Sequence, residues 1–516
     1  MDMKKILNVA LLFLLCCGAV SCDLNKYPSS ALAESEGFLT FNDATEFRRG
    51  FYALTRSCFG STIVVPINIQ AEGINTTIAN GGQLSFQYNW NMSDNDQYVE
   101  GIWANFYSTV FQLNYFLTKA NELIEKDNNL PEFDENKMTP AQLSQLNLFM
   151  AEAYFFRALI NRETAIFYCE DYDPATAADA LGIVISESAD VTARLPRVSL
   201  EETYAKINED LDRAQATIES YYAANSTVAN YITPATVKAF KAKVLLDTHQ
   251  YQECAALCEE LVLAYPLIAN DADFRSMWQN DRGSEIIFQF YASATEGATS
   301  NGGMFLTDPY QQGMNYEPYF VPSQWILDQY DSRDIRKGAY FGLKSTRMGT
   351  NNYDLYLITK YPGNPAYNSN SSVNSLLHNV RLYRSADFQL MAAECYANLN
   401  DLAKANNALK TLMNARMVAG NSTYTYEDYS SIDDVTTAIR NERFKELYME
   451  GNRIADLKRW NLPMSRLAQD PQNSETVNSN GIYLEIPADD YRFVWPIPQS
   501  ETSQNNQLKN QQNRGW

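Results

Sequence analysis

Histidine is nearly absent from this chain of 516 residues, in which only His249 and His378 occur. Neither belongs to an HExxH zinc motif, and their isolated positions argue against a histidine-based catalytic triad. The segments NGGQ and NGGM match neither GxxxxGK[ST] nor GxGxxG, so they indicate turns rather than phosphate-binding loops. The sequence therefore predicts a protein that is not an enzyme and needs no cofactor.

Positive charge is also scarce. The chain has 41 Lys and Arg against 62 Asp and Glu, which gives a formal net charge of −21. Binding to nucleic acid requires clustered cations that neutralise phosphates, so nucleic acid is excluded as a partner. Aromatic residues are frequent, with 33 Tyr, 25 Phe and 7 Trp. Together with the other apolar residues they are enough to build a large hydrophobic core.

Long hydrophobic runs are confined to the N-terminus. Two lysines precede an apolar stretch, and the segment GAVSC then ends on Cys22. This pattern predicts an export signal over residues 1–21, and its small residues resemble a bacterial lipobox, in which the cysteine is lipid-modified. Residues 22–36 are polar and are predicted to be a flexible tether. No later stretch of about 20 apolar residues exists to cross a membrane, so the lipid would be the membrane anchor.

The cysteines that follow the lipobox suggest no metal site. Their irregular spacing suits neither a disulfide framework nor a CxxC metal motif. Cys254 and Cys258 lie one helical turn apart without a nearby histidine, so burial as small apolar residues is the preferred interpretation. No metal ligand is predicted.

Helical periodicity dominates the rest of the chain. Residues 98–124 have apolar side chains at steps of three and four, which predicts one long amphipathic helix. Three further helix starts are indicated by Thr139 before a proline, by Ser199 with Glu202, and by Thr233 before a proline.

Two segments of the chain superpose without gaps. Residues 242–262, AKVLLDTHQYQECAALCEELV, match residues 393–413, AECYANLNDLAKANNALKTLM, in their small and hydrophobic positions. Each resembles a tetratricopeptide unit, two antiparallel helices with a small residue at the crossing point of each. About 150 residues separate the two copies. The predicted fold is mainly α, a split tetratricopeptide-like scaffold of helix pairs with long irregular loops and a few short strands.

Two long regions interrupt the helical pattern. Residues 270–379 are rich in Gly, Asn, Ser, Tyr and Pro, with short strand-like runs such as SEIIFQF and YDLYLITKY. Residues 62–95 form a second region of this kind. Long ordered excursions from a rigid scaffold are where binding sites usually lie.

The segment RNERFKELYMEGNRIADLKRW, residues 440–460, interleaves six cationic and four acidic side chains with apolar ones. A phosphate-binding stripe would carry one sign of charge. Glu446 and Glu450 are expected to reach Arg453 across a turn, and the other acids to pair with cations one helical turn away. We predict a structural clasp of paired charges rather than a catalytic carboxylate pair. Its residues are Glu442, Arg443, Glu446, Glu450, Arg453, Asp456 and Arg459.

Three features together resemble the SusD-like (RagB/SusD) outer-membrane lipoproteins of Bacteroidetes. They are the lipobox followed by CDLNKYPSS, the split helical units with YRSADFQLMAAECYANLND, and IRNERFKELYMEGNRIADLKRW followed by DDYRFVWPIPQSE. The ending NQQNRGW departs from the usual close of the family, because Arg514 stands where a proline is common. The resemblance implies that residues 37–516 form a single nutrient-binding domain.

The resemblance also implies a function and a location. Such a protein would be held at the cell surface of the outer membrane by a lipid on Cys22, and would deliver a nutrient oligomer to a SusC-like TonB-dependent transporter. The usual cargo of the family is a glycan, whose rings stack on aromatic side chains while amides bind the hydroxyls. Some relatives bind peptides instead.

The two loop regions supply the candidate binding residues under this interpretation. They are Tyr88, Asn89, Trp90, Tyr310, Tyr316 and Tyr319. Each could equally pack its loop against the helices. Two other functions remain open, namely a tetratricopeptide scaffold that binds the peptide tail of another protein and a lipid-anchored glycosidase.

Overall fold

The computed structural model describes seven stretches of the chain, residues 37–224, 231–293, 295–308, 315–368, 374–420, 423–467 and 470–516. The predicted export signal, the tether, the lipidation site Cys22 and the candidate residue Tyr310 lie outside them. Within these stretches no helix combines the length and the hydrophobicity that crossing a membrane requires.

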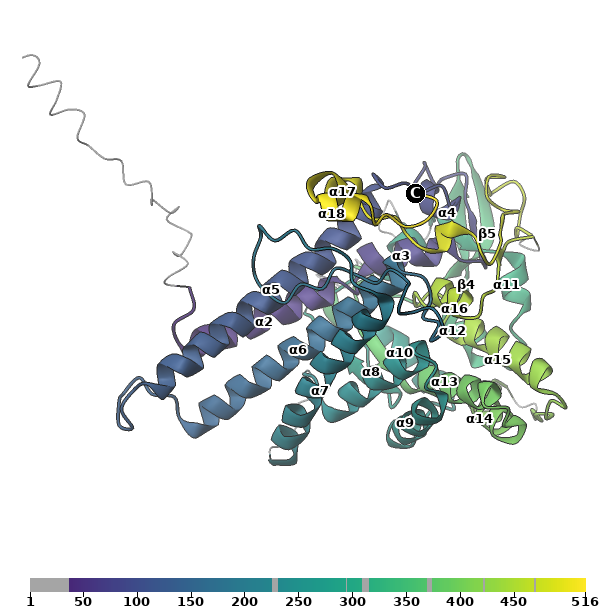
Figure 1. Ribbon diagram of the computed structural model, residues 1–516. Helices are drawn as coiled ribbons and strands as arrows, with labels where there is room; N and C mark the ends of the chain where they lie inside the picture. The colour runs from purple at the N-terminus through teal and green to yellow at the C-terminus, as the bar shows by residue number, and fades with distance from the viewer. Residues whose placement is uncertain are drawn as a thin grey trace, which may run out of the picture.

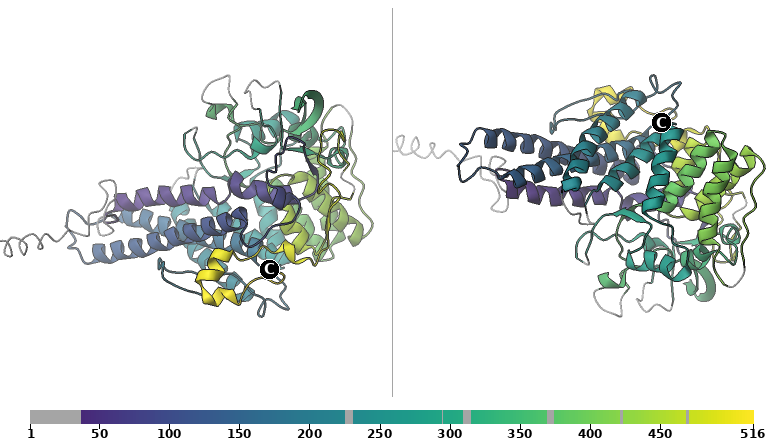
Figure 2. Two further views of the ribbon diagram at one scale, coloured as in Figure 1. Left: turned by 90° about the horizontal axis from the view of Figure 1, so that it is seen from above. Right: turned by 90° about the horizontal axis from the view of Figure 1, so that it is seen from below.

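Long helices form an elongated bundle at one end of the molecule (Figures 1 and 2). They are α2 (Phe41–Ser57), α5 (Gln97–Asn128), α6 (Pro140–Tyr168) and α7 (Leu200–Ala224). α5 packs against α2 and α6, and α6 packs in turn against α7. With 32 residues, α5 is about 48 Å long at 1.5 Å per residue. The helix predicted over residues 98–124 is thus confirmed.

Side-chain caps begin these helices where the sequence predicts. The Thr139 hydroxyl accepts a hydrogen bond from Gln142 N, while Gln142 Oε1 accepts one from Thr139 N. Thr233 and Thr236 exchange the same pair of bonds at the start of α8 (Pro234–Asp247). Each capping box satisfies backbone N–H groups that a helix start leaves without partners.

The two tetratricopeptide-like units are confirmed as helix pairs. α8 and α9 (Tyr251–Ala264) form the first, and α13 (Ser385–Asn398) and α14 (Leu402–Arg416) form the second. α13 packs against α9, so the two units lie side by side despite their separation in sequence. Small residues are fully buried at corresponding positions of the four helices, namely Ala242, Cys254, Ala393 and Ala405.

The two irregular regions meet beside this scaffold. β1 (Ile74–Thr76), from the first region, pairs antiparallel with β3 (Phe320–Pro322), from the second. Within the second region β4 (Phe341–Met348) and β5 (Asn351–Ile358) form a hairpin, and β2 (Ile286–Gln289) pairs with β6 (Arg381–Arg384). The predicted strand-like runs are therefore confirmed. The short helices here are α3 (Ser61–Gln70), α4 (Ser85–Tyr88), α10 (Asp271–Asn280), α11 (Gln324–Asp328) and α12 (Ile335–Tyr340).

The C-terminal part of the chain closes the structure over both regions. It contains α15 (Ile432–Glu446), α16 (Arg453–Arg459), β7 (Met464–Ser465), β8 (Glu485–Ile486), α17 (Gln499–Gln504) and α18 (Asn506–Lys509). α15 packs against α13 and α14, whereas α16 reaches α3. Gly451, at a φ of +81°, makes the turn between α15 and α16, a backbone conformation that favours glycine.

Candidate ligand-binding cleft

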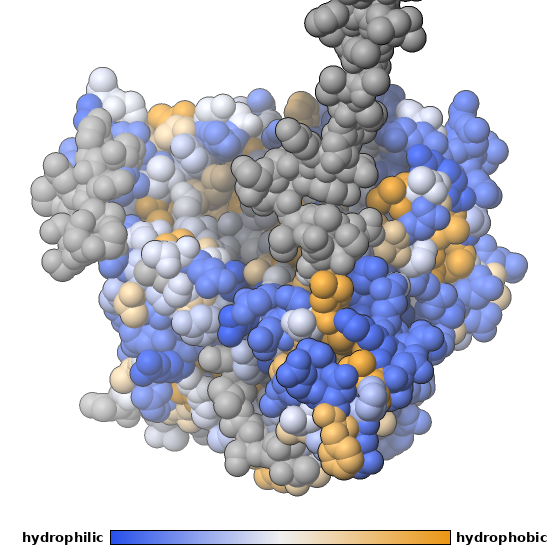
Figure 3. Space-filling model, turned by 90° about the vertical axis from the view of Figure 1, so that its left-hand side faces the viewer, coloured by the Kyte–Doolittle hydropathy of each residue, from blue (hydrophilic) through white to orange (hydrophobic). Residues whose placement is uncertain are grey.

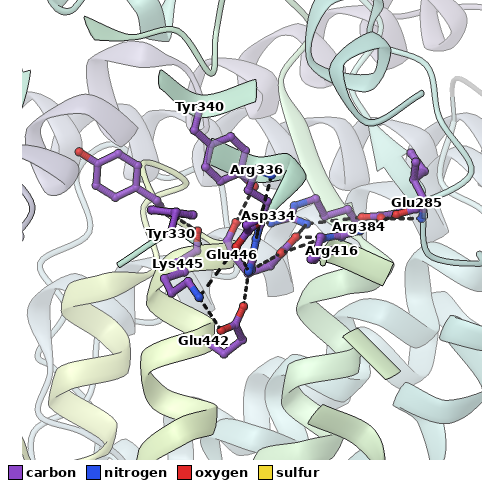
Figure 4. Close-up of polar contacts among 12 residues, drawn as sticks. Glu285, Tyr330, Asp334, Arg336, Tyr340, Arg384, Arg416, Glu442, Lys445 and Glu446 are labelled. Atoms are coloured by element: carbon purple, nitrogen blue, oxygen red, sulfur yellow. Dashed lines mark hydrogen bonds and ion pairs between the residues drawn. The ribbon is translucent and has the colours of Figure 1, made fainter. Parts of the chain in front are cut away.

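Glu446 is the centre of a buried ion network at the end of α15 (Figure 4). Its carboxylate accepts hydrogen bonds from Arg336 Nη1 at 2.9 Å, Arg384 Nη1 at 2.5 Å and Arg416 Nε at 3.0 Å. Burial alone would raise the pKa of Glu446, but the three guanidinium charges outweigh it and hold the pKa well below its usual value. The carboxylate is therefore ionised at neutral pH and enclosed, as a structural ion pair requires.

Distant segments supply the partners of the clasp, and this overturns one sequence expectation. Arg453 does not bind Glu446 or Glu450; its Nε lies 3.0 Å from an oxygen of Glu72. Glu450 instead binds Lys360, at 2.6 Å. Spacing along a helix indicates which charges share a face, but it carries no information on which other segment packs against that face.

Other members of the clasp pair as the helical spacing predicts. Glu442 binds Lys445 at 3.0 Å, and Asp456 binds Arg459 at 2.9 Å. Arg443 joins the two helices, because its Nε lies 2.9 Å from Asp456 in α16. Each of these charges has a counter-charge, so none is left available for proton transfer.

The network also fixes α12. Arg336 binds Glu446 from this helix, and the Tyr340 hydroxyl donates to Glu446 O at 3.0 Å (Figure 4). β4 follows at the next residue, Phe341. The clasp therefore sets the position of the β4–β5 hairpin relative to the helical scaffold.

A cleft of about 700 Å³ lies beside this hairpin. Its walls come from α10, α12, β4 and the loops around Asp308 and Gly363. The volume is within the range of small-ligand sites, roughly 300–1,000 Å³. The amide side chains of Gln279, Asn368 and Asn374 contribute to the lining. The cleft can thus accommodate a sugar-sized ligand and offer it polar contacts.

Tyr316, one of the predicted binding residues, lines this cleft. Its main chain runs beside β4, where Tyr316 N donates to Ser345 O at 3.2 Å and Tyr316 O accepts from Arg347 N at 2.8 Å. The ring is half-buried and lines the cleft. Burial, together with the negative charge of Asp308, raises the pKa of its hydroxyl, which therefore stays protonated at neutral pH.

Trp90 and Tyr88 belong to the core, so the prediction that they stack on a ligand is wrong. Trp90 is 0% exposed, its Nε1 donates to Gln70 O at 2.8 Å, and its ring centroid lies 4.8 Å from that of Phe493. Tyr88 is 1% exposed, under the guanidinium of Arg466. Trp90 has a φ of +53°; the polar sequence around it gave no sign of this left-handed turn or of the inward-facing ring.

Two other predicted residues stabilise their loops. Asn89 is half-buried and its Nδ2 donates to Ser85 O at 2.9 Å, within the same turn of chain. Tyr319 is half-buried, and its carbonyl accepts from Thr77 N at 3.1 Å, which ties the two loop regions together. Of the candidate residues that the structure describes, Tyr316 is the one that lines the cleft.

Sequence reasoning missed the charged residues of the cleft, Arg275 and Lys344. Arg275 lies in α10, which begins at the edge of the second region. Lys344 lies in β4, where the alternation of apolar Phe341 and Leu343 would place it on the outer face. In the structure Leu343 is exposed and Lys344 is half-buried, so the sequence pattern of this strand gives no signal for the residue.

The described lining of the cleft holds few titratable groups. Among the described lining residues, Asp308 is the one carboxylate of this cleft, whereas glycosidases use a pair of carboxyl groups. His378 is buried, which lowers its pKa to about 4, and its ring nitrogens lie at hydrogen-bond distance from Asn379 O and Asn301 N. In the described part of the chain no cluster of three His, Cys, Asp or Glu side chains is placed to hold a metal ion.

Comparisons with known proteins agree with this fold. Residues 342–516 match the model of the SusD family, and residues 66–246 match a family model described as "Starch-binding associating with outer membrane". The SusD-like protein P38 of Formosa agariphila is 23% identical, over 91% of this chain and 95% of its own length.

Solved structures resemble the whole molecule. A SusD homolog from Bacteroides thetaiotaomicron superposes with a TM-score of 0.73 at 17% identity, over 94% of this chain and 99% of its own. A SusD superfamily protein from the same species gives 0.71 at 21% identity, over 91% and 99%. A putative sugar binding protein from Bacteroides vulgatus gives 0.70 at 18% identity, over 93% and 99%. With its split helical units, its C-terminal clasp and matches to two SusD-type family models, the chain belongs to the SusD-like family.

Proposed function

We propose that the chain is a lipid-anchored protein of the outer-membrane surface, which binds a glycan oligomer and delivers it to a SusC-like TonB-dependent transporter. The observation that carries the proposal is the cleft with Tyr316, in a chain that matches a family model described as starch-binding. An aromatic ring beside amide side chains suits a sugar, which has apolar C–H faces and hydroxyl edges. The chemistry is binding without bond breaking.

The positions of the chain start and the cleft support a role at the surface. The described chain begins beside α2, at the bundle end of the molecule, far from the β4–β5 hairpin (Figures 1 and 2). Hydrophilic side chains dominate the face at that end, with hydrophobic ones in small groups (Figure 3). A lipid on Cys22, joined through the tether of residues 22–36, would hold this end toward the membrane and leave the cleft of the single domain, residues 37–516, away from the anchor.

The scaffold alternative is less well supported. A tetratricopeptide scaffold binds its partner in a groove lined by contiguous repeats. Here the two units pack against each other through α9 and α13, and the long loop region between them carries the cleft. The glycan-binding role therefore explains the long loop region and its cleft, which a tetratricopeptide scaffold would not need.

Tyr316→Ala tests the proposal. Purified protein is first screened on a glycan and peptide array, and the affinity for the best ligand is then measured by calorimetry. Loss of a stacking ring should weaken binding about tenfold to a hundredfold. Phe133→Ala is the control, because Phe133 is 93% exposed at the distant α5–α6 turn. Unchanged affinity in Tyr316→Ala would place the binding site elsewhere. If the array shows binding to peptides alone, the cargo is a peptide rather than a glycan.

A chromatographic assay tests the absence of catalysis. Incubation of the wild-type protein with its glycan ligand should leave the length of the oligomer unchanged. Shortened products that persist after repeated purification would favour the glycosidase alternative.

A further inference from the structure

Lys344 lies on the inner side of the β4–β5 hairpin. Leu343 and Ser345, its neighbours along β4, are exposed, whereas Lys344 is half-buried and lines the cleft. Its cross-strand partner is Leu355, which is 3% exposed. Residues directly opposite in an antiparallel pair share one face of the sheet. Lys344 therefore extends over an apolar strand surface toward the cleft rather than into open solvent.

This cation differs from three other buried or half-buried lysines, each of which has a carboxylate partner. Lys243, Lys360 and Lys445 have carboxylates at 2.5, 2.6 and 3.0 Å. Lys344 forms no such ion pair with any residue that the structure describes. Residues 309–314 and 369–373, which adjoin cleft residues in sequence, contain no Asp or Glu. A half-buried lysine without a described carboxylate partner leaves its ammonium group available to an anionic ligand group.

A second cation lies at the rim of the same cleft. Arg275 Nε binds Asp271 at 2.8 Å, and Nη1 of the same guanidinium donates to Gly338 O. Gly338 has no side chain at the point where a Cβ would overlap the guanidinium, so Arg275 can lie close to the main chain of α12. These two contacts hold the half-exposed guanidinium at the rim, and its remaining N–H groups are available to a ligand.

The described lining of the cleft holds two cations, Arg275 and Lys344, and one carboxylate, Asp308. Because Asp271 pairs with Arg275, Lys344 is the cation that lacks a described counter-ion. A neutral sugar can accept hydrogen bonds from an ammonium group through its hydroxyls, but it cannot compensate the positive charge. A charged substituent on the sugar would provide the counter-ion that Lys344 lacks, through a charge-assisted hydrogen bond.

We propose that Lys344, with Arg275 at the rim, binds an anionic substituent of the glycan cargo, a carboxylate or a sulfate. The proposal rests on the proposed function, and it specifies the substrate class of the same cleft. Gln279 and the Nδ2 of Asn368 would then bind the hydroxyls of the ring that carries the charge, whereas the Asn374 amide is engaged by Pro362 and Leu376.

Calorimetry with three probes tests this assignment. The probes are an oligogalacturonate, which carries carboxylates, a sulfated carrageenan oligosaccharide, and a neutral malto-oligosaccharide. The wild type should bind one of the anionic probes at least tenfold more tightly than the neutral one, and the preference should decrease at high salt. Lys344→Gln should lose about tenfold toward that probe, whereas Lys344→Arg should keep most of the affinity.

Lys410→Gln is the matched control, because Lys410 is a half-buried lysine of α14 that does not line the cleft. Equal affinity of wild type and Lys344→Gln for the anionic probe would overturn the inference. So would tighter binding of the neutral probe, although the proposed glycan-binding function would then stand. If no saccharide binds and an acidic peptide does, both the inference and the glycan cargo are wrong.

Discussion

Arg453 in α16 binds Glu72, although 381 positions separate the two residues in the chain. The Glu72 side chain is 5% exposed and that of Arg453 is 19% exposed. The guanidinium also lies 4.4 Å from the ring centroid of Phe444. This pair attaches the C-terminal corner to the loop region that follows α3, so it stabilises a contact between the two ends of the domain.

Arg453→Ala should lower the free energy of unfolding by roughly 2–4 kcal/mol, because it leaves Glu72 buried without its partner. Urea denaturation measures the change. Arg49→Ala is the control, since Arg49 pairs with Glu46 on the surface, where an ion pair contributes little. Ligand affinity of the folded Arg453→Ala protein should equal that of the wild type. A collapse of affinity at native stability would instead make Arg453 a binding residue.

Glu446→Gln should make stability less dependent on acid pH. The pKa of Glu446 is depressed in the folded state, so its stabilising contribution is complete above the unfolded value of about 4.5 and is lost as pH falls below it. The variant should be about 3–5 kcal/mol less stable than wild type at pH 7. The difference in unfolding free energy between wild type and variant, measured by urea denaturation, should become smaller from pH 4.5 downward. A difference that stays constant between pH 7 and pH 3 would contradict the assignment.

Trp90→Ala should unfold the protein more readily without changing the site. The fully buried ring would leave a cavity next to Phe493, at a cost of about 3–5 kcal/mol. We expect a clear fall in melting temperature and unaltered affinity in the folded fraction. Phe86→Ala is a close control, because Phe86 lies four residues earlier and is 59% exposed. If Trp90→Ala instead binds the ligand more weakly at an unchanged melting temperature, Trp90 is a ligand-binding residue.

Cys22→Ala should release the protein from the membrane while it remains folded, because the lipid on Cys22 is the proposed anchor. Cell fractionation followed by circular dichroism measures both properties. Cys17→Ala, which leaves the lipobox cysteine in place, should remain in the membrane fraction. Retention of Cys22→Ala in membranes would rule out the lipid as the sole anchor.

The helical scaffold was predictable because its signals are local. The capping pattern at Thr139, the apolar periodicity of α5 and the small residues of the repeated units act within one or two helical turns. The ion pair between Glu442 and Lys445 belongs to the same class, since three positions on a helix bring two side chains together.

The cleft was not predictable in the same way, because it depends on contacts between distant segments. Trp90 has polar neighbours in sequence, yet Gln70 and Phe493 enclose it. Lys344 becomes a candidate once the register of β4 against β5 shows it opposite a buried leucine. Composition located the two loop regions, but it could not separate their packing residues from those that face a ligand.

The packing of α9 against α13 has a consequence for how the chain folds. The two helices are made far apart in time during synthesis, because residues 265–384 lie between them. Until α13 is present, the face of α9 that it covers remains apolar and solvated, a state prone to aggregation. Contacts of such high sequence separation also slow folding. Truncation anywhere before α13 should therefore yield an insoluble or rapidly degraded fragment rather than a folded N-terminal half.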